Sequence, residues 1–250
     1  RFYRMYAGGR DLDVFGAHDR VYFGRYEDGP LESPFAGNLA EICPTGVFND
    51  RGWSENYARK WDMAATPSIC AQCSVGCTLF AAERDGRVRR VQNRYHGAIN
   101  GHFLCDRGRF GALHAADHRL DAARVGGAAV ARDAAERAAR AALAEGAVGI
   151  GSPRASLETN AALRRLVGAE RFFAGVAEHE ARAVARMAAL LAPGRGASLA
   201  AMERADAVLV LGEDLTGTAP RAALALRQTA RGAADALAAE KGVPAWLDTA

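Results

Sequence analysis

Apolar residues recur every three to four positions through most of the second half of the chain, with charged residues between them. This spacing is typical of amphipathic helices that bury one face. Gly168 and Pro193-Gly194 are suitable stop signals, and Pro220 suits the first turn of a helix. The pattern predicts helices over residues 131–145, 156–168, 178–192 and 219–232.

Two short apolar runs, 146–152 ("GAVGIGS") and 205–214 ("ADAVLVLGED"), interrupt these helices. Each is bounded by glycine or charge, which favours a buried strand. We expect 205–214 to be the clearest strand in the chain. Strands that alternate with helices indicate a parallel sheet covered by helices, so the predicted fold class is α/β.

The first half of the chain has a different pattern. Residues 1–60 are rich in glycine, aromatic residues and turn signals, which predicts loops with short strands, and Asp50 is a candidate N-cap for a short helix. Residues 78–93 contain two short runs around Asp85-Gly86, a type I′ turn signal, and therefore predict a β-hairpin.

Composition supports this division. Residues 1–110 contain 11 alanines and all five cysteines, whereas residues 111–250 contain 45 alanines and no cysteine. The net charge of +3 gives no reason to expect a nucleic-acid partner, and no apolar run approaches the ~20 residues of a membrane span. The chain begins without Met, and we expect it to be an internal fragment of a longer protein.

Four cysteines have the spacing of a cluster site: Cys70, Cys73 and Cys77 lie within eight residues, and Cys105 follows after 27 more. Four thiolates are the ligand set of a [4Fe–4S] cubane. Gly76 would let the chain fold tightly around the cluster. Two cations after Cys105, Arg107 and Arg109, could offset the negative charge of the thiolates.

Other interpretations of these cysteines stay open. A structural zinc site usually pairs two Cys-x-x-Cys knuckles, and the second knuckle is missing here. A disulfide framework suits a small secreted protein better than an α/β chain with an odd number of cysteines. Buried free thiols are the third interpretation. Cys43, in "EICPTG", is followed by proline as some ferredoxin ligands are, and it is either a ligand of another cluster or a structural thiol.

Longer stretches resemble a known family. "AGGRDLDVFGAHDRVYFGR", "LESPFAGNLAEICPTGVF", "RKWDMAATPSICAQCSVGC" and "NRYHGAINGHFLCDRGRF" are similar to the large iron–sulfur subunit of bacterial NADH–quinone oxidoreductase, or respiratory complex I. The resemblance covers nearly the whole chain. It is weakest over 123–145 and 193–206. The stretch 63–119 also resembles the [4Fe–4S] domain that opens molybdopterin oxidoreductases such as formate dehydrogenase.

The resemblance implies two clusters and three regions. Cys43 would be the distal ligand of one [4Fe–4S] cluster whose other cysteines precede Arg1, where the family also allows a [2Fe–2S] cluster. Cys70, Cys73, Cys77 and Cys105 would hold a second [4Fe–4S] cluster, which only some members have. The implied regions are the end of a ferredoxin-like region (1–62), a [4Fe–4S] domain (63–119) and the beginning of a molybdopterin oxidoreductase-like α/β domain (120–250).

The implied function is electron transfer from NADH toward quinone in the peripheral arm of a proton-pumping complex. The fragment itself has no catalytic residue. Expected partners are the flavin-bearing, NADH-binding subunit and the connecting subunits, on the cytoplasmic side of the bacterial inner membrane. The alternatives are the catalytic subunit of a molybdenum formate dehydrogenase and a scaffold with a structural cluster. Arg107 stands where molybdenum enzymes often have lysine, and no cysteine follows Cys105, so no molybdenum is expected.

Overall fold

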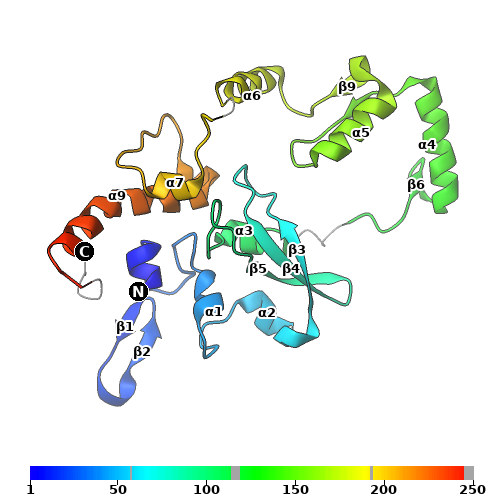
Figure 1. The fold of residues 1–250 in the computed structure, drawn as a ribbon. Helices are drawn as coiled ribbons and strands as arrows, with labels where there is room; N and C mark the ends of the chain where they lie inside the picture. Colours follow the sequence, from blue (N-terminus) through cyan, green and yellow to red (C-terminus); the bar gives the residue numbers. More distant parts are fainter. Residues whose placement is uncertain (57, 114–118, 192–193, 245–250) are drawn as a thin grey trace. The chain divides into compact units, whose positions relative to one another are not determined.

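The computed structural model describes residues 1–56, 58–113, 119–191 and 194–244 (Figure 1). The chain divides into two compact units. Unit 1 comprises residues 1–117 and 197–250, and unit 2 comprises residues 118–196. Among the described residues, no helix combines the length and the apolar character that crossing a bilayer would require.

A three-stranded antiparallel sheet forms the centre of the first part of unit 1. Its strands are β3 (Ala64–Ile69), β4 (Thr78–Arg84) and β5 (Arg87–Asn93), in that order across the sheet. The predicted hairpin is confirmed, and both Asp85 (φ 56°) and Gly86 (φ 76°) have the positive φ of a type I′ turn. β3 was not predicted. It is an exposed edge strand, where Pro67 is tolerated because its missing N–H is not needed by a neighbour.

Short elements surround this sheet, as the turn-rich sequence predicts. Asp50 is the N-cap of α2, since its carboxylate accepts a hydrogen bond from the backbone N–H of Trp53 at 2.7 Å, and this prediction is confirmed. The other elements before residue 118 are η1 (Phe2–Tyr6), β1 (Asp13–Phe15), η2 (His18–Arg20), β2 (Tyr22–Gly24), α1 (Asn38–Ile42), α2 (Arg51–Glu55), η3 (Lys60–Asp62) and α3 (Asp106–Phe110).

The rest of unit 1 consists of helices. α7 (Leu199–Glu203) and α8 (Leu215–Thr218) both contact α9 (Pro220–Glu240), which begins with Pro220 as predicted and runs eight residues beyond the predicted end. The predicted strand over 205–214 is wrong. A strand needs the hydrogen bonds of a neighbouring strand, and within the described ranges no strand pairs with this segment. Leu209 and Leu211 are accordingly exposed, at 80% and 78%.

Unit 2 contains the parallel part of the fold. β8 (Gly149–Ile150) pairs in parallel with β9 (Phe172–Phe173), and α5 (Leu157–Val167) lies between them in the chain. The α/β class is thus confirmed, although the parallel sheet is a single pair. α5 ends at Gly168 as predicted, where φ is 87°. The other elements are β6 (Arg124–Val125), β7 (Ala128–Ala129), α4 (Arg132–Gly146), η5 (Ala169–Arg171) and α6 (Glu178–Leu190).

The helix predictions in unit 2 are largely confirmed. α4 and α6 occupy the stretches predicted for them. α6 already ends at Leu190, and the proposed stop at Pro193 lies outside the described residues.

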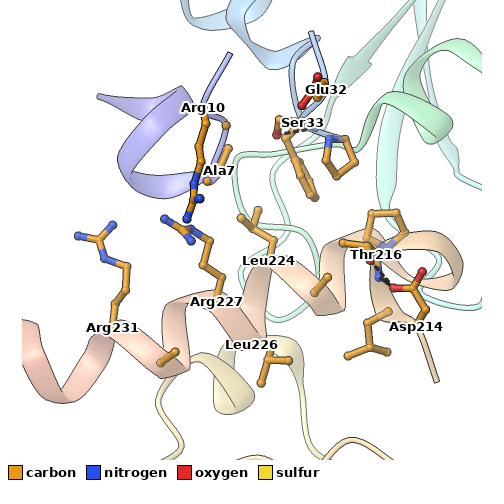
Figure 2. Close-up of a pocket in the computed structure, with 18 of the residues that line it drawn as sticks. Ala7, Arg10, Glu32, Ser33, Asp214, Thr216, Leu224, Leu226, Arg227 and Arg231 are labelled. Carbon is orange, nitrogen blue, oxygen red and sulfur yellow. Dashed lines mark hydrogen bonds between the residues drawn. The ribbon is translucent and has the colours of Figure 1, made fainter. Parts of the chain in front are cut away.

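A cavity of about 830 Å³ lies in unit 1 beside α9 (Figure 2). Arg10, Arg227 and Arg231 lie at one end of it, and Asp214 with Thr216 lies at the other. None of the five cysteines lines this cavity, so it is separate from the candidate metal centre.

Candidate metal centre

The three clustered cysteines lie on the loop that joins β3 to β4, directly before the hairpin. The backbone N–H of Cys70 donates to the carbonyl of Cys77 at 2.8 Å and closes the loop on itself. Gly76 has a φ of 65°, a conformation that residues with a side chain rarely adopt, so its predicted role in the tight turn is confirmed. The sheet therefore holds both ends of the loop in place.

Cys105 reaches the same region from α3. It is the N-cap of this helix, and the N–H of Gly108 donates to its Sγ at 3.4 Å. Gly108 lies against the thiols, because a Cβ built there would be 3.1 Å from Cys70 Sγ and 3.5 Å from Cys105 Sγ. The thiols of two distant segments thus meet over a residue with no side chain.

We call Cys70, Cys73, Cys77 and Cys105 the four-thiol site. Cys70, Cys77 and Cys105 are buried, and burial is the main reason why the pKa of each thiol is raised, for Cys77 to about 12. The pKa of Cys77 is raised further by negative charge on the other three thiols. Thiols that repel one another in this way lose their protons readily only when a positively charged metal ion or iron–sulfur core binds to them.

Arginine side chains supply positive charge next to these thiols. The positive charge of Arg107 partly opposes the rise in the pKa values of Cys70 and Cys105 that burial causes. Its guanidinium donates to the carbonyls of Gly217 at 2.6 Å and Thr218 at 2.9 Å, which fixes its position. The interpretation of Arg109 as a second such cation is wrong, because Arg109 is buried and pairs with the carboxylate of Glu41 at 2.7 Å instead.

A further buried cation, Arg221 on α9, partly opposes the rise in the pKa of Cys77 that burial and the other thiols cause. Its Nη1 is buried and has no hydrogen-bond partner among the described residues. A buried guanidinium nitrogen without a partner, close enough to Cys77 to act on its pKa, is destabilising unless a negative group such as an anionic cluster lies within its reach. Within the part of the chain that the structure describes, however, no three His, Cys, Asp or Glu side chains form a group that could hold a single metal ion. The ligand set therefore stays a prediction.

Cys43 lies in a different setting. It follows α1, is partly exposed, and its Sγ lies 3.4 Å from Thr45 Oγ1. A backbone hydrogen bond from Phe48, the Thr45 hydroxyl and further N–H groups of this loop lower the pKa of the Cys43 thiol to about 6. The loop therefore presents a thiolate stabilised by hydrogen bonds, which is the form that binds iron. The role of Cys43 as a ligand of a separate cluster stays a prediction.

A buried hydrogen-bond network joins two segments of unit 1. One is the segment 37–43, which ends at Cys43 and is called the Cys43 arm, and the other is the segment 104–109, called the Cys105 arm. Asn38, which is fully buried, donates to the carbonyl of Leu104 at 2.8 Å and accepts from the N–H of Leu104 at 3.1 Å. Arg109 donates to Asn38 Oδ1 at 2.9 Å as well as to Glu41, while Asp106 accepts from the N–H of Gly37 at 2.8 Å. These contacts fix the two candidate ligand segments relative to each other.

Sequence reasoning missed Asn38, Asn100 and Arg221. One signal was available for Arg221, since it shares the face of α9 that carries Leu224 and Ala225, and all three are buried. A charged residue on the apolar face of a helix indicates a buried partner. No comparable signal marks Asn38 or Asn100, because each depends on a partner far away in the chain, Leu104 for Asn38 and Thr78 for Asn100.

Comparison with known proteins adds two family matches. Residues 1–49 match the ferredoxin-like domain of NADH-quinone oxidoreductase subunit 3. Residues 63–117 match the molybdopterin oxidoreductase Fe4S4 domain. The first match covers Cys43, and the second covers the whole four-thiol site. Iron–sulfur binding is therefore supported for both regions.

Relatives extend the similarity to the full chain. The G subunit of NADH-quinone oxidoreductase from Shewanella oneidensis is 53% identical over 98% of this chain. Those of Pseudomonas fluorescens and Escherichia coli are 52% identical over 100% and 50% identical over 98% of it. The resemblance to the large iron–sulfur subunit is confirmed. The chain spans 28% of the length of each of these three relatives, and the similarity to them does not favour the formate dehydrogenase alternative.

Proposed function

We propose that the chain is the electron-transfer segment of a large iron–sulfur subunit, and that it carries reducing equivalents from NADH toward quinone in the peripheral arm of complex I. The observation that supports this proposal is the four-thiol site. Its three buried cysteines and the half-buried Cys73 all lie within the matched Fe4S4 domain. Iron–sulfur clusters, when bound, accept and release single electrons without acid–base help from the protein.

The residues of the chain hold, orient and shield the clusters. Cys70, Cys73, Cys77 and Cys105 would ligate one [4Fe–4S] cluster in a site whose burial keeps water away from the sulfurs. Cys43 would supply one ligand to a second [4Fe–4S] cluster in the full-length protein. We infer that this second cluster is on the conduction path and that the cluster of the four-thiol site is off it.

The proposed partners are the flavin-bearing, NADH-binding subunit and the connecting subunits of the peripheral arm. We place the complex on the cytoplasmic side of the bacterial inner membrane. The region 130–250 serves as a scaffold in this proposal and binds neither molybdopterin nor NADH, since the loop after β8 has one glycine too few for close approach of a phosphate.

The test compares two cysteine variants of the full-length protein in the intact complex. Cys43→Ser should remove one cubane and reduce NADH-to-quinone electron flux to near background. Cys73→Ala should remove a different cubane and leave most of the flux. Iron content, EPR spectra and quinone reduction are measured on the same preparations. Full flux in a Cys43→Ser complex that has lost its cubane would contradict the proposal and favour the scaffold alternative.

A further inference from the structure

Arg221 is the second residue of α9 and only 4% exposed. Its Nε donates to the carbonyl of Asn100 at 3.2 Å, and its Nη2 donates to Glu203 Oε1 at 2.6 Å. Its Nη1 is buried without a hydrogen-bond partner in the described part of the chain. A buried guanidinium that leaves one nitrogen unpaired is destabilising unless another negative group lies within its reach.

Asn100 connects this arginine to the four-thiol site. Asn100 is fully buried, and its side chain accepts from the N–H of Thr78 at 3.1 Å and donates to the carbonyl of Thr78 at 3.2 Å. Thr78 directly follows Cys77 and begins β4. The backbone of Asn100 thus holds Arg221 while its side chain holds the end of the cysteine loop.

We propose that Arg221 is a charge-compensating residue that stabilises the reduced form of the cluster in the four-thiol site and so raises its reduction potential. The inference rests on the proposed function, because it assumes that these four thiols hold a cubane. Reduction adds one electron, and therefore one negative charge, to a site already surrounded by thiolates. A fixed positive charge nearby favours that added charge, and burial strengthens the interaction because little water screens it.

The neighbouring charges set the direction and the size of the effect. Glu203 is 25% exposed at its side chain and partly neutralises Arg221, so removing its carboxylate should act in the opposite direction. Arg107 also lies near the thiols, but it is exposed to solvent and hydrogen-bonded to two carbonyls, so its charge is better screened. Arg221 is therefore the cation whose loss should change the potential most.

The experiment is a redox titration of the full-length protein in the intact complex, with dithionite as the electron donor and EPR as the readout. The signal that Cys73→Ala removes identifies the cluster of the four-thiol site. Arg221→Gln should shift the midpoint potential of that signal to a more negative value. We expect about a tenfold change in the reduction equilibrium, which equals ~59 mV for one electron. Arg221→Lys should stay near the wild type, and Glu203→Gln should shift the potential to a more positive value.

Arg227→Gln is the matched control, since it removes an arginine from the same helix that contacts the carbonyl of Tyr6 instead. Equal potentials for Arg221→Gln and the wild type, or equal shifts for Arg221→Gln and Arg227→Gln, would overturn the inference. If Arg221→Gln does not assemble the cluster, Glu203→Gln decides, and an unchanged potential there overturns the inference. Absence of any wild-type signal that Cys73→Ala removes would instead overturn the ligand set itself.

Discussion

Asn38→Ala should destabilise unit 1 strongly, because this side chain holds the Cys43 arm to the Cys105 arm. The substitution removes both hydrogen bonds to Leu104, a residue with 0% exposure, and the acceptor for Arg109. A buried backbone group that loses its partner costs about 1–3 kcal/mol, so the N–H and C=O of Leu104 together predict a loss of about 2–6 kcal/mol in the free energy of unfolding.

Urea unfolding followed by tryptophan fluorescence measures this loss in unit 1. Trp53 and Trp61 both belong to unit 1, whereas residues 118–196 contain no tryptophan. Amide hydrogen exchange at Leu104 should accelerate in parallel, since its N–H loses its acceptor. Asn49→Ala is the matched control at an exposed position, where a change within about 0.5 kcal/mol is expected. If Asn38→Ala costs no more than Asn49→Ala, the network does not connect the two arms.

Two further predictions concern the thiols directly. Gly108→Ala should lower the iron content of the reconstituted chain, because the new Cβ would lie 3.1 Å from Cys70 Sγ, and iron analysis beside Gly232→Ala, a distant glycine with open space around it, checks this; an unaltered iron content would show that the thiols do not gather there. In the metal-free protein, iodoacetamide at pH 7 should alkylate Cys43 first and Cys77 last, since their pKa values are about 6 and about 12. The rate at Cys43 should fall as the pH drops through about 6 and its thiolate is protonated, and peptide mass spectrometry that finds Cys77 modified first would refute this order.

Local sequence signals predicted the elements that depend on neighbouring residues. The Asp85-Gly86 turn, the Asp50 cap and the Gly168 helix end each follow from the conformation or hydrogen bonds of a few adjacent residues. Residues 205–214 show the limit of this reasoning, because an apolar run becomes a strand only when another strand pairs with it.

The sequence indicates candidate thiols for the site, but it does not predict the charges that surround them. Cysteine spacing indicated the candidate thiols, and the resemblance assigned Cys43 to a different cluster. The partners of the arginines depend on long-range packing, however. Arg109 was interpreted as a cation for the thiols, yet it pairs with Glu41, which is 68 residues away in the chain. Arg221 lies 121 residues from Asn100, its hydrogen-bond partner, and no local pattern brings such segments together.

The central claim is that four of the five cysteines hold one cubane, and anaerobic reconstitution of the 250-residue chain tests it most directly. The wild type should bind about four iron and four sulfide per chain, with the charge-transfer absorbance of a [4Fe–4S] cluster. Cys73→Ala should lose this cluster, whereas Cys43→Ser should keep the full iron content because we assign Cys43 to another cluster. A zinc-only product without that absorbance, or a Cys43→Ser chain that loses its iron, would contradict the account.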